Sequence, residues 1–151
     1  MKRKIMRISA LAMAGIMLCQ TPVLADGVDQ PYLSLGADLN KQERQTVLRL
    51  LGVNESELDN YTVVQITNAD EHEYLDDYLS ASVIGSRALS SVLIEKTGEG
   101  SGINVTTKNI TYCTEGMYEN ALSTAGIADA DVVVAGPVSY THLRAHETLS
   151  D

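Results

Sequence analysis

The sequence predicts an α+β fold: a βαββαβ core of the ferredoxin-like, split βαβ type, preceded by one or two helices. Three observations support this class. Short β-branched runs alternate with segments of helical periodicity, these segments follow one another in the order β-α-β-β-α-β, and a Gly-rich stretch separates the middle two runs as a hairpin loop would. In that arrangement an antiparallel sheet carries both helices on one face.

The first predicted helix follows Asn40. Asn40 and Glu43 have the spacing of a capping box, in which each side chain accepts a hydrogen bond from the other residue's backbone N–H. Apolar positions within 47–51 then repeat on one helical face. Gly52 is the residue type that most often ends a helix in the left-handed conformation. A second, very short helix is predicted to begin at Asn54.

The predicted core starts with a strand. The run 61–67 is β-branched and aromatic, and it is too short for a buried helix. Asn68 and Glu71 again have capping-box spacing, which predicts the start of an acidic helix. The runs 89–95 and 103–111 predict two further strands, joined by the Gly-rich loop.

The last two predicted elements are a helix and a strand. Apolar side chains within 117–125 recur on one helical face, and Gly126 is expected to end that helix. The continuous apolar run 131–135 is typical of a buried strand. The chain turns polar soon after this strand, without the helix that usually follows, so we expect the domain to be truncated at its C-terminus.

Residues 1–25 have the three parts of a secretory signal peptide. A basic start is followed by an apolar run, 8–18, and then by small residues before an acidic segment, so cleavage is predicted between Ala25 and Asp26. A retained membrane anchor is the alternative. The apolar run is shorter than the roughly 20 residues that span a bilayer. We therefore expect a secreted or envelope-associated protein with no transmembrane anchor after cleavage.

The last residues differ in character from the rest. Residues 138–151 resemble a translated sequencing adapter, and they hold two of the three His residues of the chain. We expect this segment to be an artefactual, disordered tail; a genuine polar tail is the alternative. The predicted organisation is a signal peptide at 1–25, a single incomplete α+β domain at 26–137, and the tail.

The charge of the chain limits its partners. Eleven Lys and Arg stand against twenty Asp and Glu, which gives a formal net charge of −9 before the basic leader is removed. Binding a phosphate backbone requires clustered cations. Nucleic acid is therefore excluded as a predicted partner, and no motif predicts a cofactor.

Four blocks of sequence are similar to the YpuA-like family, domain of unknown function 1002, of exported Gram-positive bacterial proteins. The blocks read PYLSLGADL (31–39), VVQITNADEHEYLDDYL (63–79), SVIGSRALSSVLIEKTGEGSGI (82–103) and NITYCTEGMYENALSTAGIADADV (109–132). The resemblance implies export, a bacterial source, and a chain that continues in family members beyond this domain. It implies no activity, because the family has none assigned.

An acidic helix start is the one candidate metal site. Glu73 and Asp77 lie four residues apart on one helical face, and Asp70 lies one turn earlier, so three carboxylates would supply oxygen ligands for calcium. The favoured interpretation is electrostatic, so no metal site is assigned and these three residues remain weak candidates. Acidic residues near a helix N-terminus oppose the positive end of the helix dipole and keep that face solvated.

Cys113 and His72 are the candidate nucleophile and base. A thiolate just before a helix is favoured by the partial positive charge there, and an imidazole would activate it. Nothing in the sequence brings the two together, and a buried thiol, or a thiol paired outside this chain, is the competing interpretation. The leading hypothesis is therefore a non-catalytic binding or structural module at the cell envelope. The alternative is a hydrolase or enzyme subunit whose catalytic residues lie beyond this chain.

Overall fold

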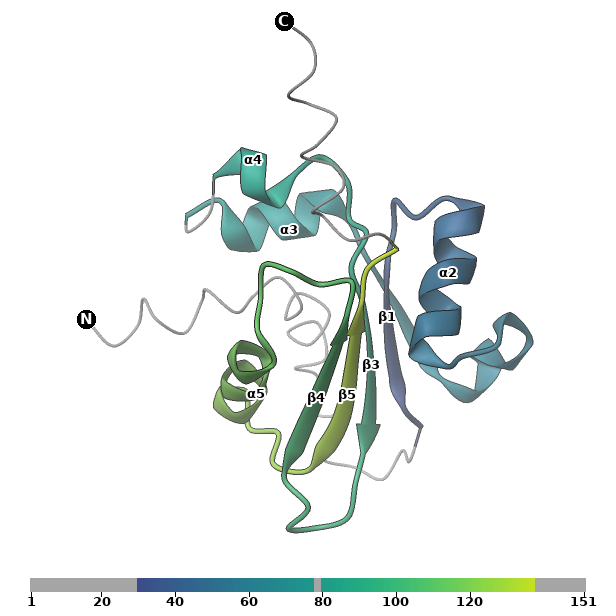
Figure 1. Cartoon of the computed structure of the whole chain (residues 1–151), viewed down its shortest axis with the longest axis vertical. Coiled ribbons are helices and arrows are strands. Elements are labelled where there is room, and N and C mark those ends of the chain that lie inside the picture. The colour runs from purple at the N-terminus through teal and green to yellow at the C-terminus, as the bar shows by residue number, and fades with distance from the viewer. Residues whose placement is uncertain (1–29, 78–79, 138–151) are drawn as a thin grey trace, which may run out of the picture.

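The computed structural model describes residues 30–77 and 80–137, which fold around one five-stranded sheet (Figure 1). The predicted signal peptide, its cleavage site and the predicted tail lie outside the described residues. The strands are β1 (Tyr32–Gly36), β2 (Thr62–Ile66), β3 (Ser91–Lys96), β4 (Ile103–Lys108) and β5 (Ala130–Ala135). The helices are α2 (Lys41–Leu51), the 3-10 helix η3 (Glu55–Asn60), α3 (Asn68–Leu75), α4 (Ala81–Ile84) and α5 (Glu115–Thr124).

The sheet is mixed, and its order is β2-β1-β3-β5-β4. β1 pairs in parallel with β2, and β4 pairs in parallel with β5, whereas β3 runs antiparallel to both of its neighbours, β1 and β5. The predicted α+β class is confirmed. The predicted antiparallel, ferredoxin-like order is not the order of this sheet, because two parallel βαβ units flank one antiparallel strand.

The predicted β3–β4 hairpin is wrong, because β5 lies between these two strands. β5 pairs with β3 on one side and with β4 on the other, so that Val132 is in register with both Ile94 and Val105. A strand paired on both sides and covered on both faces is expected to be apolar throughout. β4 instead exposes Asn104 and Thr106, as an edge strand does.

β1 was absent from the sequence prediction, and it lies between β2 and β3. Its Leu33 and Leu35 are fully buried and alternate with the half-buried Ser34. The strand has five residues, bracketed by Pro31 and by a glycine. This alternation is the only local signal of β1, and it is too short to separate a strand from a turn.

Helices cover both faces of the sheet (Figure 1). On one face α2 packs over Leu33 and Leu35 of β1 and Leu93 of β3. On the other face α5 packs over Val132 and Val134 of β5. α3 and α4 lie at one end of the sheet, and each contributes a buried side chain to the α5 cluster. The two helices that were predicted for the core, α3 and α5, thus share one hydrophobic cluster, and α2 forms the other.

The predicted capping box of α2 is confirmed. Asn40 Oδ1 accepts a hydrogen bond from the Glu43 N–H, and Glu43 Oε2 accepts one from the Asn40 N–H, each at 2.9 Å. Gly52 ends the helix with φ 77°, a conformation that residues with a Cβ rarely adopt. Within the described residues, no helix is both long and apolar enough to cross a membrane.

Candidate functional site at the carboxyl edge of the sheet

Four of the five strands end at the same edge of the sheet. β1, β2, β4 and β5 share one direction, and β3 starts where they end. In open α/β sheets, ligands bind outside the carboxyl ends of the strands. Three segments bring polar side chains to the β2-β1-β3 part of this edge. They are the loop after β1 (37–40), helix α3 after β2, and the segment before β3 (85–90). We call this group the polar edge; it consists of Asp38, Asn68, Glu71, His72 and Arg87.

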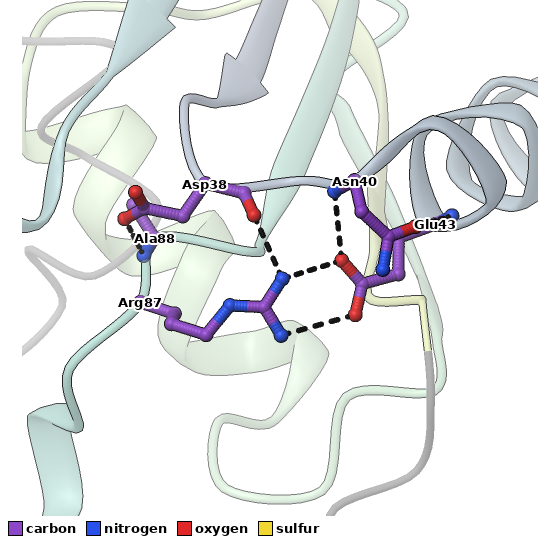
Figure 2. Close-up of polar contacts among 5 residues, drawn as sticks. All are labelled: Asp38, Asn40, Glu43, Arg87 and Ala88. Carbon is purple, nitrogen blue, oxygen red and sulfur yellow. Dashed lines mark hydrogen bonds and ion pairs between the residues drawn. The ribbon is translucent and has the colours of Figure 1, made fainter.

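The Arg87 side chain is held by Glu43 in α2 and by Asp38 in the loop after β1 (Figure 2). Its Nη1 and Nη2 donate to the two carboxylate oxygens of Glu43 at 3.1 and 2.6 Å, and Nη2 also donates to the Asp38 carbonyl oxygen at 2.8 Å. The hydrogen bond from Arg87, together with the Asn40 N–H, holds the pKa of Glu43 below its ordinary value. Bidentate geometry makes this a well-oriented ion pair.

Asp38 joins the loop after β1 to the segment before β3. Its Oδ2 accepts the Ala88 N–H at 2.8 Å (Figure 2). Its own N–H donates to the Ala88 carbonyl oxygen at 3.2 Å. Deeper in the edge, the Gly36 N–H donates to Oγ of the fully buried Ser91 at 3.2 Å. These contacts bring the two backbones close together beside the polar edge.

Glu71 is the buried acid of the polar edge, with only 4% of its surface exposed. Its Oε2 accepts a hydrogen bond from Asn68 Nδ2 at 3.2 Å. The pKa of Glu71 is raised to about 7, mainly by burial and to a smaller degree by the nearby Asp38 charge, against the lowering effect of the Asn68 hydrogen bond. Near pH 7 this carboxyl therefore exists in both protonation states. Strongly perturbed acids of this kind cluster at functional sites.

His72 links α3 to the segment before β3. Its Nδ1 lies 2.7 Å from Asp76 Oδ1, and its Nε2 lies 3.2 Å from the Gly85 carbonyl oxygen. Both contacts are satisfied together only when both ring nitrogens carry protons, because a carboxylate and a carbonyl only accept hydrogen bonds. The bond to Asp76 accordingly raises the pKa of His72.

The three weak candidates for calcium ligands are not brought together. Asp70 Oδ2 accepts hydrogen bonds from the Thr67 N–H and hydroxyl, at 2.8 and 2.7 Å. The capping box of α3 therefore joins Thr67 to Asp70, one residue before the predicted pair Asn68 and Glu71. These bonds lower the pKa of Asp70. Glu73 and Asp77 are exposed. Among residues 30–77 and 80–137 no group of three His, Cys, Asp or Glu is arranged to hold a metal ion, and we assign no ligand to this helix.

Cys113 is a buried thiol in the cluster beneath α5. Burial raises its pKa, opposed by a hydrogen bond with Tyr118. A raised pKa disfavours the thiolate that a nucleophile requires. His72, the candidate base, contacts Asp76 and Gly85 instead. The geometry thus favours the structural interpretation of Cys113 over the catalytic one.

Asp38 and Arg87 were missed by the sequence prediction. Arg87 Nη2 bonds the Asp38 carbonyl across 49 residues of chain, and no local pattern records such a pair. Asp38 had one usable signal, since a polar residue just after a strand lies at the carboxyl edge of the sheet. That signal is readable only once β1 is recognised as a strand.

The fold and the polar edge define a class of protein: an α+β domain with a mixed five-stranded sheet and a cluster of carboxylate, imidazole and guanidinium groups at its carboxyl edge. A family model described as "Protein of unknown function (DUF1002)" matches residues 35–141, and the chain belongs to this family.

Among individual proteins, the chain is similar to one from Bacillus subtilis (strain 168) described as "Uncharacterized protein YpuA". The two are 45% identical over 153 aligned residues, which cover 95% of this chain and 51% of the relative. The chain thus spans about half the length of this curated relative. No solved structure matches the chain.

Proposed function

We propose that the domain is a non-catalytic binding module that is exported to the cell envelope and that binds an anionic group through the polar edge. The observation that carries the proposal is the state of Arg87. Its guanidinium is held in one orientation by Glu43 and Asp38, yet 44% of its side chain is exposed. A guanidinium has five N–H donors, and the contacts to these two residues use three of them.

A fixed and partly exposed guanidinium suits a pair of oxygens on a carboxylate or phosphate. Its orientation is already set, so a ligand does not bear the entropy cost of ordering this side chain. The net negative charge of the chain, −9, repels polyanions in general. The edge is therefore expected to select a local anionic group, such as the carboxylate of a wall peptide, over a long anionic polymer.

Export rests on the leader at residues 1–25. Expression in a Gram-positive host is expected to yield a processed product that begins at Asp26, found outside the cytoplasm, because the leader ends in small residues just before the acidic segment. N-terminal sequencing of the product checks this. A chain that retains its first methionine would contradict the prediction.

An enzyme is the second candidate, and one observation favours it. Glu71 has a pKa of about 7 in a buried position, the range expected for a general acid or base near neutral pH. In this alternative the other catalytic residues lie outside the present chain.

One experiment separates the two functions. The processed protein is incubated with purified peptidoglycan sacculi, and both the co-sedimented protein and the soluble fragments released are measured. We expect co-sedimentation without release, and about a tenfold weaker association for Arg87→Gln, since a lost charged hydrogen bond costs about 1.5 kcal/mol. Arg49→Gln, which changes an exposed arginine on α2, is the matched control and is expected to bind like the wild type.

Two outcomes would reject the binding module. Equal co-sedimentation of the Arg87 and Arg49 variants would show that the polar edge does not hold the ligand. Release of soluble fragments that is lost in Glu71→Gln would favour the enzyme.

A further inference from the structure

Two side chains of α3 bond the same carbonyl oxygen in the segment before β3. Asn68 Nδ2 lies 3.3 Å from the Gly85 oxygen, and His72 Nε2 lies 3.2 Å from it. We call these two hydrogen bonds the α3 joint. Asn68 Nδ2 also donates to Glu71 Oε2 at 3.2 Å, so the acid and the joint share one amide group. A change at the carboxylate therefore reaches the joint directly.

The surroundings of Glu71 favour its neutral form. Only 4% of the residue's surface is exposed, and two of the charges that face it are negative: Asp38 from the loop after β1 and Asp70 from its own helix. His72 is the cation that faces it, and Asn68 is its polar neighbour. A buried carboxylate is costly unless charges or hydrogen bonds compensate it. One imidazolium and one amide oppose two carboxylates here.

We propose that the protonation state of Glu71 controls whether the α3 joint is formed. With its proton, the carboxyl is neutral and stays buried, and the Asn68 amide bonds both Glu71 and Gly85 through its two N–H groups. Without its proton, the carboxylate is costly to keep buried and draws water to itself, and α3 separates from the segment before β3. The device belongs to the free protein and does not depend on the ligand proposed above.

His72 acts in the same direction. Its raised pKa means that the folded state favours the imidazolium, and the stability this adds is lost as pH rises through the folded-state pKa. The neutral ring keeps one N–H, so it cannot donate to both Asp76 and Gly85. Both titrating groups thus hold the joint at acidic pH and release it at alkaline pH.

The sign of the Glu71 effect follows from its pKa of about 7 in the folded protein, against an ordinary 4.5. The folded state binds more protons than the unfolded state between these values, so stability falls as pH rises from about 4.5 to about 7 and is level above that. The groups whose pKa is lowered, such as Glu43 and Asp70, are already ionised above pH 5.5 in both states. A comparison of pH 5.5 with pH 8 therefore isolates Glu71 and His72.

The test measures urea unfolding of the processed protein at pH 5.5 and pH 8, together with hydrogen exchange of the 85–88 amides corrected for intrinsic rates. The unfolding equilibrium constant is expected to rise roughly 25-fold between the two pH values from Glu71 alone. Glu71→Gln should lose that factor and keep slow exchange at pH 8, because a neutral amide replaces the carboxyl. Glu73→Gln, an exposed change on the same helix, should behave like the wild type.

Retention of the full pH dependence by Glu71→Gln would overturn the proposal. The wild type provides a second test that does not rely on a folded variant. Carbon-detected NMR should show the Glu71 carboxyl titrating near pH 7, with the 85–88 amides shifting at the same midpoint. Titration of Glu71 in the ordinary range of a glutamate would also overturn the proposal.

Discussion

Gly36→Ala is expected to destabilise the domain by about 3 kcal/mol or more, although it adds a single methyl group. A Cβ at this position would lie 2.3 Å from the Ala88 carbonyl oxygen and 2.9 Å from the carbonyl carbon of Leu89. These are backbone atoms of the segment before β3, so no rotamer change relieves the overlap. The two backbones must separate, and the Gly36 N–H bond to Ser91 and the Asp38 pairing with Ala88 are lost with them.

A matched glycine provides the control for this prediction. Gly116 lies in the first turn of α5, and a Cβ there would meet nothing within 4 Å. Gly116→Ala is expected to leave stability unchanged or to raise it by up to about 1 kcal/mol, because alanine favours helix. Urea unfolding of both variants at one pH measures the difference. Equal stabilities would show that the close approach at Gly36 does not constrain the fold.

The parts of the fold that the sequence predicted are stabilised by neighbours in the chain. Asn40 and Glu43 cap α2 across three residues, and Gly52 ends it, so all the information lies within one short window. α5 is similar, since Thr114 accepts the Met117 N–H at its start. Capping and periodicity are local interactions, and they are readable before the tertiary structure is known.

The order of the strands depends on interactions that no window contains. The strand β1 is specified by burial of Leu33 and Leu35 against α2, which the sequence alone does not show. The Gly-rich loop predicts a hairpin because turn residues between two strand-like runs are typical of one. The run 131–135 carried the contrary signal, since a continuous apolar strand belongs in the middle of a sheet and the alternating 103–108 belongs at its edge.

In the candidate site, too, the local features could be predicted from the sequence and the tertiary contacts could not. The acidic helix was recognised from its composition, but which of its acids is buried depends on packing against the loop after β1 and the segment before β3. The sequence offered Asp70, Glu73 and Asp77 as weak candidates. Asp70 caps the helix and the other two are exposed, whereas Glu71 is the buried acid. The pKa of Glu71 follows from that burial and from Asp38, 33 residues earlier in the chain.

Leu122→Ala is expected to cost about 2–5 kcal/mol, the range for a leucine truncated in a closely packed interior. Leu122 is fully buried in the cluster between α5 and the sheet, against Val132 and Val134. Removing the side chain loses the free energy gained by transferring its apolar atoms from water to the interior. It also leaves a cavity that the strands close only in part. Val63→Ala is the matched control, because Val63 is 40% exposed on β2 and its truncation should cost well under 1 kcal/mol.

The effect of Leu122→Ala should also reach the polar edge. Leu75, at the end of α3, belongs to the same cluster, so loosening of the cluster loosens the helix that carries Glu71 and His72. Amide hydrogen exchange in α3 is therefore expected to rise in Leu122→Ala and to stay unchanged in Val63→Ala, while urea unfolding gives the two free energies. Unaltered α3 exchange alongside a large loss of global stability would show that α3 is anchored by its own polar contacts rather than by the shared hydrophobic cluster.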